Sequence, residues 1–540
     1  MTVTHVEAFI VGAGFGGIYQ CYSLKKLGLS VRVIDTAGGV GGTWYWNRYP
    51  GAMSDTESYL YRYSWDKKDL RTFPWSHHYV TQQEILAYLN HVVDIHELRP
   101  NIQLRTEMLS ANWDDGQEIW RVGTTNGTFT CRYLITSLGL LSKQNFPNIP
   151  GIGTFKGELT HTASWKPELD LTGKRVGIIG NGSTGTQVMT AIAPIVKELI
   201  SFQRHPQYSV PSGNKPITAE YRQWVNDNYD AIWEQAFTSA TAFGFVESTR
   251  PVMSVSPAER TKIFQELWDR GNGFRFMFGG FGDITTSEEA NEEAAKFIRS
   301  KIAEIVKDPV KAKLLQPTDL YARRPLCDSG YYDIFNRENV NIVDVSTVPI
   351  SEIVEDGLRT ADGKVHKLDV LIFATGFDAI DGNYMRMQIT GHGGRTIQDH
   401  WKDGATSYLG VALSGFPNMF MVLGPQGPFA NNPPAIESEV NFITAAIANA
   451  EKRRQSGAPS ILHVSEKAER GWGELCDNLT EGSLFKRTAS WIFGANIPGK
   501  KEATKFYFGG LKAYRETARS VADEGFKPFY DRAVTKETTR

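Results

Sequence analysis

The sequence predicts an α/β fold made of two Rossmann-like dinucleotide-binding domains with a helical insertion, and three observations predict it. The strand-like run AFIV leads directly into Gly12-x-Gly14-x-x-Gly17. A second strand, RVGII, leads into another GxGxxG loop farther along the chain. Such loops let a helix N-terminus approach a pyrophosphate group. Residues 216–318, by contrast, show helical spacing with charged faces and contain no strand–glycine–helix unit.

Length and composition bound the class of protein. A chain of 540 residues is too long for one hydrophobic core, so two or three domains are expected. A net charge of −2 gives no basic excess, so we expect no nucleic-acid partner. Because no apolar run reaches membrane-span length and no signal peptide is recognisable, we predict a cytoplasmic protein that does not enter a membrane. We also expect a monomer. Four scattered cysteines without a CxxC pair predict neither a metal site nor a redox dithiol.

The first nucleotide unit covers residues 6–35, which are predicted to form a strand, a glycine turn, a helix and a second strand. Asp35 ends that second strand, about twenty residues after the glycines. A carboxylate there accepts hydrogen bonds from a ribose diol and repels a 2′-phosphate. The site therefore suits FAD or NAD rather than NADP, the alternative being a βαβ unit without a ligand.

Aromatic residues are dense in the next segment, residues 38–65, which carry the run GGTWYWNRYPGAMSDTESYLYRYSW. Such a run can cap a large core, or it can present flat apolar surface to a cofactor. Arg48 and Asp55 are charges within this aromatic setting, and buried charges need partners. We therefore interpret both as candidate site residues.

Elements farther along repeat the first pattern. Residues 83–95 predict an amphipathic helix, and residues 101–138 predict a small antiparallel sheet. The buried strand in residues 132–142 ends at Gly139, and the run DVLIFATGFD at residues 369–378 ends in the same way. This recurrence supports a duplicated dinucleotide-binding architecture.

The second glycine loop is Gly180-x-Gly182-x-x-Gly185, and residues 155–165 are predicted to be the connector that leads into it. The strand that follows its helix ends in Arg204 rather than in an acid. An arginine there can bind a 2′-phosphate, and no carboxylate opposes it. The second site therefore favours NADPH, unless Arg204 only meets solvent.

These patterns divide the chain into interleaved parts. We expect the first nucleotide domain in residues 1–145 and 381–540, the second in 146–217 and 323–380, and the helical insertion in 218–322. The last part includes SWIFGANIPGKK, a loop by its Gly, Pro and Asn content. It is either a lid over NADPH or a docked C-terminal loop.

Two adjacent cations, Arg323 and Arg324, precede a proline between the helical insertion and the return to β structure. Residues alone leave two interpretations open, a surface turn or an anion site at a domain junction.

The pattern Phe155-x-Gly157-x-x-x-His161-x-x-x-Trp165 closely resembles the fingerprint of type I Baeyer–Villiger monooxygenases. The resemblance spans nearly the whole chain, including GTWYWNRYPGA, RPLCDSGYY, FATGFDA and SWIFGANIPGKK, and is similar to the cyclohexanone (cycloalkanone) branch. Lys166 departs from the family, which usually has Pro or Asp after the tryptophan. The resemblance implies a structural or coupling role for His161 rather than that of a catalytic base.

The family resemblance implies FAD at the first loop and NADPH at the second. It implies oxidation of cyclic ketones to lactones, or of ketones to esters, with O2 through a C4a-peroxyflavin that must stay deprotonated. Arg324 matches the family cation that favours this anion, and Asp55 matches the acid that tunes the arginine. These two are the predicted catalytic residues.

The resemblance also assigns cofactor contacts beyond the loop glycines and Asp35. On the FAD side these are Thr43, Trp44, Trp46 and Tyr61. On the NADPH side they are Ser183, Thr184, Arg204, Arg323, Trp491 and Lys500. Arg323 stands where relatives usually carry Lys, and 2′-phosphate selection should survive this exchange. Trp491 would close over the bound NADP+.

Positions that match the family's substrate pocket are mostly apolar, which suits a cyclic ketone. They are Leu141, Phe243, Phe274, Phe429, Ala430, Asn432 and Phe506. Close relatives usually have Thr and Leu in place of Ala430 and Asn432, so these two residues are expected to alter substrate range.

Other classes remain as alternatives. An N- or S-oxygenating flavoenzyme would have less use for Arg324, and its related linker ends in Tyr rather than Trp165. A disulfide reductase lacks its cysteine pair here. A non-catalytic NADP-binding sensor would be expected to lose Arg324 or Asp55, and both are present.

Overall fold

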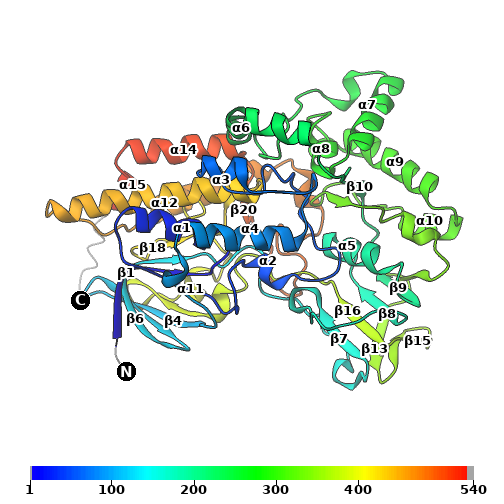
Figure 1. Ribbon diagram of the computed structural model, residues 1–540, viewed down its shortest axis with the longest axis horizontal. Helices are drawn as coiled ribbons and strands as arrows, with labels where there is room; N and C mark the ends of the chain where they lie inside the picture. The colour runs from blue at the N-terminus through cyan, green and yellow to red at the C-terminus, as the bar shows by residue number, and fades with distance from the viewer. Residues whose placement is uncertain (1–2, 532–540) are drawn as a thin grey trace.

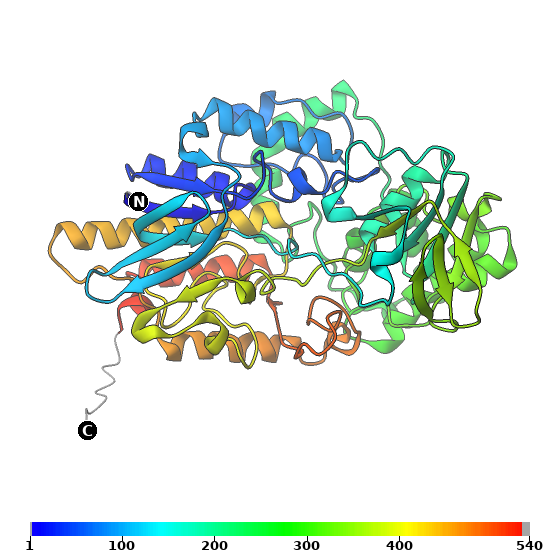
Figure 2. The ribbon, with the colours of Figure 1, turned by 90° about the horizontal axis from the view of Figure 1, so that it is seen from below.

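The computed structural model describes residues 3–531. Within them the strands form two large sheets at opposite ends of an elongated molecule, and helices of the middle of the chain cover one side of the second sheet (Figure 1). Figure 2 shows the same two halves from below, with the C-terminal loop segment between them. The α/β class with two Rossmann-like units is confirmed.

The first sheet has the order β17-β4-β5-β6-β1-β2-β3, and β18 pairs with the far half of β6. Its strands are β1 (Val3–Val11), β2 (Val31–Ile34), β3 (Ile102–Gln103), β4 (Met108–Asp114), β5 (Ile119–Thr124), β6 (Gly127–Thr136), β17 (Gln388–Thr390) and β18 (Met419–Met421). The antiparallel pairing predicted for residues 101–138 is confirmed for β4, β5 and β6, but these strands do not form a small sheet of their own. β6 also pairs parallel with β1 and so merges them into the main sheet.

Helices from both ends of the chain pack on this sheet. α1 contacts α12, and α12 contacts α14, so the C-terminal segment completes the first unit. The helices are α1 (Phe15–Lys26), α2 (Thr43–Trp46), α3 (Lys67–Thr72), α4 (Gln82–Ile95), α11 (Ile397–His400), α12 (Asn432–Gln455), α13 (Glu466–Thr480), α14 (Leu511–Asp523) and α15 (Lys527–Tyr530). The helix predicted at residues 83–95 is confirmed; a capping box of Thr81 and Glu84 begins it.

The second sheet is fully parallel, with the order β12-β9-β8-β16-β7. Its strands are β7 (Glu158–His161), β8 (Arg175–Ile179), β9 (Glu198–Gln203), β12 (Val340–Asp344) and β16 (Val370–Phe373), and α5 (Ser183–Ile192) follows β8. Residues 155–165 precede β8 and the second loop, as predicted for a connector, but they also contain a strand that was not predicted. This strand, β7, forms the edge of the sheet and pairs parallel with β16, the strand before the ATG turn.

The helical prediction for residues 216–318 is confirmed. The helices are α6 (Ala219–Thr238), α7 (Pro257–Arg270), α8 (Gly273–Phe278), α9 (Glu288–Ile305) and α10 (Pro309–Leu315). Each begins after a residue whose side chain accepts backbone N–H groups, namely Thr218, Ser256, Asn272, Ser287 and Asp308. These caps explain why the polar stretch divides into separate helices.

Smaller elements complete the fold. A three-stranded antiparallel sheet contains β13 (Ile350–Val354), β14 (Gly357–Thr360) and β15 (Val365–Lys367). Two short parallel pairs are β10 (Ser209–Pro211) with β11 (Leu326–Asp328), and β19 (Gly427–Pro428) with β20 (Phe506–Tyr507). Among residues 3–531, none of the helices has both the length and the apolar character of a membrane span. No group of three or more metal-ligating side chains occurs in the same part of the chain.

Candidate active site between the two sheets

One large cavity joins the two glycine loops. Its volume is about 1290 Å³, above the roughly 300–1,000 Å³ that is usual for a small-molecule site. It is lined by both loops, by the aromatic segment after the first loop, by part of α8 and by the C-terminal loop around Trp491. A cavity of this size and extent can hold two nucleotides together with a small substrate.

The first glycine loop is shaped by close backbone contacts. Gly12 has φ +107°, and a β-carbon on it would lie 2.2 Å from the Ser137 carbonyl oxygen. A β-carbon on Gly17 would lie 1.8 Å from the Gly12 oxygen. Gly14 packs against Gly42, whose own β-carbon would be 2.9 Å from the Gly14 Cα. Glycine is therefore required at Gly12, Gly17 and Gly42 for the loop to close, and the segment around Gly42 covers it.

Asp35 lies beside this loop and lines the cavity. Its Oδ2 accepts the Ala13 N–H at 2.7 Å, and its Oδ1 accepts the Ala37 N–H at 2.8 Å. Burial raises the pKa of Asp35, and the two backbone hydrogen bonds oppose this rise. Each carboxylate oxygen has a second lone pair, so the group fits a ribose diol while it also fixes the loop.

Aromatic side chains follow the loop on the cavity wall. Thr43, Trp44 and Trp46 come from α2, and the Trp44 Nε1–H donates to the Tyr61 hydroxyl at 3.1 Å. Arg48 turns away from this wall: it donates to the Tyr45 carbonyl and its guanidinium lies 4.1 Å from the Tyr45 ring. The structure thus explains Arg48 by local contacts alone.

The second glycine loop repeats the close contacts of the first but remains open. A β-carbon on Gly180 would lie 2.4 Å from the Ala374 oxygen, and one on Gly185 would lie 2.2 Å from the Gly180 oxygen. Gly182 has no atom within 4 Å of a β-carbon position and faces the cavity. That open position is the cradle a pyrophosphate needs at the start of α5, where Ser183 and Thr184 also line the cavity.

Basic residues gather beyond this loop. Arg204 is exposed, lines the cavity and makes no ion pair with any described residue. Arg323 also lines the cavity and pairs with Asp319 at 2.7 Å. His205 lies 3.8 Å from the same carboxylate. This corner fits a 2′-phosphate, and Arg204 is the cation there that makes no ion pair with another described residue.

Lys500 lies elsewhere than the sequence suggests. Its Nζ is bound by Asp378 at 2.5 Å and by Asp381 at 2.8 Å, and the residue does not line the cavity. The lysine therefore holds the C-terminal loop to the segment after the ATG turn. A phosphate contact from Lys500 would require both ion pairs to open.

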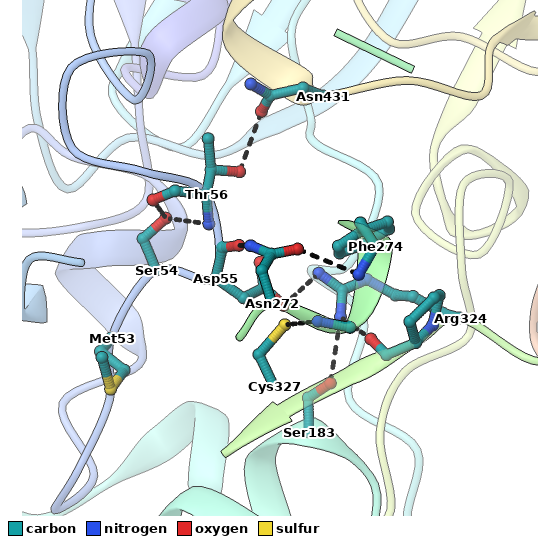
Figure 3. A network of polar contacts seen from close by, with 12 residues as sticks. Met53, Ser54, Asp55, Thr56, Ser183, Asn272, Phe274, Arg324, Cys327 and Asn431 are labelled. Atoms are coloured by element: carbon teal, nitrogen blue, oxygen red, sulfur yellow. Dashed lines mark hydrogen bonds and ion pairs between the residues drawn. The ribbon is translucent and has the colours of Figure 1, made fainter. Parts of the chain in front are cut away.

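Arg324 lies between the second loop and the first domain (Figure 3). Its Nη2 is 2.6 Å from Asp55 Oδ2, and its Nη1 donates to Ser183 Oγ at 3.1 Å. Burial alone would lower the pKa of Arg324, but the Asp55 carboxylate raises it. The guanidinium therefore keeps its positive charge inside a half-buried cavity, where it can stabilise negative charge on a reacting oxygen.

An apolar slot lies next to this cation. The Phe274 ring lies 5.1 Å from the Arg324 guanidinium and stacks on Phe243 at 3.8 Å between centroids. Phe506 packs against both Phe429 and Trp491, at 5.3 Å and 5.8 Å. All residues expected at the substrate line the cavity, namely Leu141, Phe243, Phe274, Phe429, Ala430, Asn432 and Phe506. The arrangement suits a flat or cyclic apolar molecule with one polar group.

The fingerprint residues do not reach the cavity. Phe155, Gly157, His161 and Trp165 lie outside its lining. His161 is buried at the end of β7, with its ring 5.0 Å from Phe146 and 6.0 Å from Phe377. Burial lowers its pKa to about 4, against a Gly376 backbone contact that raises it. A neutral histidine packed on the ATG turn supports a coupling role rather than that of a base.

Some polar residues of the site were not singled out from the sequence. Asn272 donates to the Asp55 backbone oxygen, the Gly273 N–H donates to the Cys327 thiol, and Asn431 accepts from the Thr56 hydroxyl at 3.1 Å (Figure 3). Cys327 lies within the RPLCDSGYY motif, but Asn272 and Asn431 precede α8 and α12, and only the fold brings these segments together.

The fold and the cavity define a class: an oxidoreductase with two dinucleotide sites that face each other. The model of the pyridine nucleotide-disulphide oxidoreductases matches residues 9–229. Its disulfide chemistry is not available, because all four cysteines are buried and unpaired.

Similar proteins identify the family within this class. The cyclohexanone 1,2-monooxygenase of Acinetobacter sp. is 50% identical over 97% of this chain and 96% of its own length. The solved cyclohexanone monooxygenase of Rhodococcus sp. Phi1, bound to NADP+, is 52% identical with a TM-score of 0.96, over 98% of this chain and 99% of that one. The chain therefore belongs to the Baeyer–Villiger monooxygenases, in the cyclohexanone monooxygenase group. A phenazine N-monooxygenase of Lysobacter antibioticus is also 48% identical, over 97% of each chain.

Proposed function

We propose that this protein oxidises ketones, cyclic ones above all, to lactones or esters with NADPH and O2. The observation that carries the proposal is the position of Arg324. It is kept charged by Asp55 at 2.6 Å and lies between the NADP loop and an aromatic slot. A carbonyl bound in that slot would react beside a permanent cation.

The chain's residues fit two nucleotides. FAD would lie along the first loop, with Asp35 at its ribose and the Trp44–Tyr61 wall beside it. NADPH would lie along the second loop, with Arg204 at its 2′-phosphate. Bound together, these cofactors supply hydride transfer and activation of O2.

The side chains supply charge and exclude water. Arg324 stabilises negative charge on the oxygen that attacks the ketone and on the carbonyl oxygen that follows, without giving up a proton. Asp55 fixes the direction of the guanidinium. The stacked Phe243 and Phe274 rings keep water from the reacting atoms and hold the ketone against the cation.

The test measures NADPH consumption in air with and without cyclohexanone, and identifies the product by gas chromatography. We expect caprolactone to form in step with NADPH consumption. NADPH consumption that yields only hydrogen peroxide, with cyclohexanone and with a panel of larger ketones, would reject ketone oxidation.

A second candidate is N- or S-oxygenation, which the similarity to a phenazine N-monooxygenase favours. This reaction does not require an anionic oxidant, so it does not require the positive charge of Arg324. Sulfide and phenazine oxidation that survives Arg324→Ala, with no ketone oxidation by the unmodified enzyme, would support this alternative.

We also propose that the enzyme acts as a cytoplasmic monomer. Four buried thiols without a disulfide suit a reducing compartment. Size-exclusion chromatography with light scattering tests the monomer, and fractionation of the source cells tests the location.

A further inference from the structure

Asn272 stands out among the residues behind the active site because of its backbone and its burial. It is 2% exposed and has φ +77° and ψ 113°, a conformation that residues with a β-carbon rarely adopt. It is the residue before α8, the helix that carries Phe274. Strain of this kind persists only where surrounding contacts hold it.

The Asn272 side chain uses all of its hydrogen-bonding capacity. Its Oδ1 accepts the N–H groups of Phe274 at 3.0 Å and Arg275 at 3.2 Å. Its Nδ2 donates to the backbone oxygen of Asp55 and to the Tyr79 hydroxyl, both at 3.1 Å. The amide orientation follows from these partners, because a flipped amide would point its NH2 at two N–H donors. Figure 3 shows Asn272 between Asp55 and the start of α8.

A second contact joins the same two segments. Arg275, three residues after Asn272, pairs with Glu57 at 2.6 Å, and both side chains are nearly fully buried. α8 therefore holds the Asp55–Glu57 turn at both ends, by an amide at Asp55 and by an ion pair at Glu57. These two buried contacts therefore restrain the Asp55 backbone from both sides.

We infer that Asn272 is a positioning residue for oxygenation, acting through Asp55 on Arg324. Its amide sets the Asp55 backbone, which aims the Asp55 carboxylate at Arg324 Nη2. The same amide begins α8 and so places the Phe274 ring against the guanidinium. One side chain thus sets the distance between the cation and the aromatic slot. The inference rests on the proposed ketone oxidation.

Asparagine fits this position better than aspartate or glycine would. Aspartate would keep the acceptor for α8 but would turn a second oxygen toward the Asp55 carbonyl. Glycine would accept the backbone conformation without strain but would remove all four hydrogen bonds. The glycine variant therefore isolates the side chain, and the aspartate variant isolates the two donor bonds.

The test compares Asn272→Gly with the matched control Asn418→Gly. Asn418 is also buried, has φ +54° and accepts a backbone N–H from Leu462 at 2.8 Å, but it lies in the first unit away from the cavity. With cyclohexanone, we expect Asn272→Gly to lower the ratio of lactone to hydrogen peroxide at least fivefold, with less than a twofold change in the KM for NADPH. Asn418→Gly should leave the ratio unchanged.

A double-mutant cycle separates positioning from general damage. If Asn272 acts through Asp55, adding Asn272→Gly to Asp55→Ala should change the ratio less than Asn272→Gly does in the wild type, because only the contacts at the start of α8 remain to be lost. A crystal structure of Asn272→Gly gives a readout independent of turnover: the separation of Arg324 Nη2 and Asp55 Oδ2 should exceed 3.5 Å. Asn272→Asp serves the same comparison if the glycine variant fails to fold.

The outcomes distinguish this inference from the proposed function. A wild type that forms no lactone from any ketone rejects the proposed function and this role together. A working wild type whose Asn272 variants keep the normal ratio, or whose effects add fully to Asp55→Ala, rejects the positioning role alone.

Discussion

The two glycine loops share their backbone contacts and differ in what covers them. In each loop the first glycine lies against the residue after a neighbouring strand, Ser137 or Ala374, and the third lies against the first. The middle glycines differ. Gly14 is packed against Gly42, whereas Gly182 faces open space.

This difference suits two kinds of cofactor use. A nucleotide at the first loop would be enclosed by the chain's own segment around Gly42 and would stay bound through many turnovers. A nucleotide at the second loop would be reached from the open cavity and could exchange. The residues that follow β2 and β9 differ as well. The Asp35 carboxylate accepts two backbone N–H groups, whereas Arg204 makes no ion pair with any described residue.

The third glycines test the comparison with the largest expected effect. Gly17→Ala should give protein without flavin, because its β-carbon would lie 1.8 Å from the Gly12 oxygen. Gly185→Ala should stay yellow but resist reduction by NADPH. The flavin-to-protein ratio and rapid-mixing reduction measure both. Gly153→Ala, which has open space around it, is the control. Loss of flavin from Gly185→Ala would contradict the independence of the two loops.

Arg324→Ala removes the cation between the loops. Loss of one group that stabilises a developing oxyanion costs roughly 3–4 kcal/mol, or about 10²–10³ in kcat. Flavin content and reduction by NADPH should remain, while NADPH oxidation yields hydrogen peroxide. Arg250→Ala, which breaks only an exposed ion pair with Glu259, controls for loss of charge. Lactone formation within tenfold of wild type would refute the assignment.

His161 should make the second unit sensitive to acid. Its pKa is about 4 in the folded protein, whereas an unfolded histidine titrates near about 6.5. The unfolded chain therefore binds the proton first, and the free energy of unfolding falls as pH drops through this window, by up to about 3 kcal/mol. Thermal unfolding at pH 7 and pH 4.5 should show a smaller loss for His161→Gln. An equal loss of stability in the wild type and in His161→Gln would show that His161 is not the source of the acid sensitivity.

Arg204→Ala should weaken NADPH binding selectively. Hydrogen bonds to charged groups contribute about 1.5–3 kcal/mol, so the KM for NADPH should rise roughly 10- to 150-fold. The KM for NADH is the internal control and should not change. Arg323→Ala should have a smaller effect, since that arginine already pairs with Asp319. Parallel changes for both nucleotides would show that Arg204 does not contact the 2′-phosphate.

Gly182→Ala should give the smallest and most selective change. Its φ of −73° is open to alanine, and the entropy gain of alanine is offset by its poorer fit at the N-cap of α5, so the stability of the apoprotein should change by less than about 1 kcal/mol. The added methyl group should still lower NADP+ affinity, because it occupies the open cradle. Thermal unfolding and NADP+ titration of the flavin spectrum measure the two effects, and an unchanged affinity would show that the nucleotide does not approach Gly182.

Much of this architecture follows from local sequence. Strand–glycine–helix units are identified by short-range chemistry, since only glycine permits the contacts at Gly12, Gly17, Gly180 and Gly185. Helices in the insertion follow from their spacing and caps. The antiparallel pairing of β4, β5 and β6 was predicted, but their place in the main sheet was not, because pairing of β6 with β1 depends on residues more than a hundred positions away.

The candidate site likewise combines residues that motifs identify with residues that only the fold brings together. Arg324 and Asp55 were recognisable from motifs, but their 2.6 Å ion pair joins residues 269 positions apart. The family resemblance assigned Lys500 to NADPH, yet Asp378 and Asp381 hold it. Nothing local marks Asn272, whose four partners come from three separate segments.

The sequence by itself therefore determined the fold class, the two nucleotide loops, their opposite preferences for a 2′-phosphate and the family. These features depend on residue type at fixed short spacing, where backbone sterics and charge leave few choices. Only the tertiary structure decided which loop is covered, which cations are already paired and what holds Asp55 in place. Those properties arise where distant segments bury polar groups together, and each group must then find whichever partner the fold brings within reach.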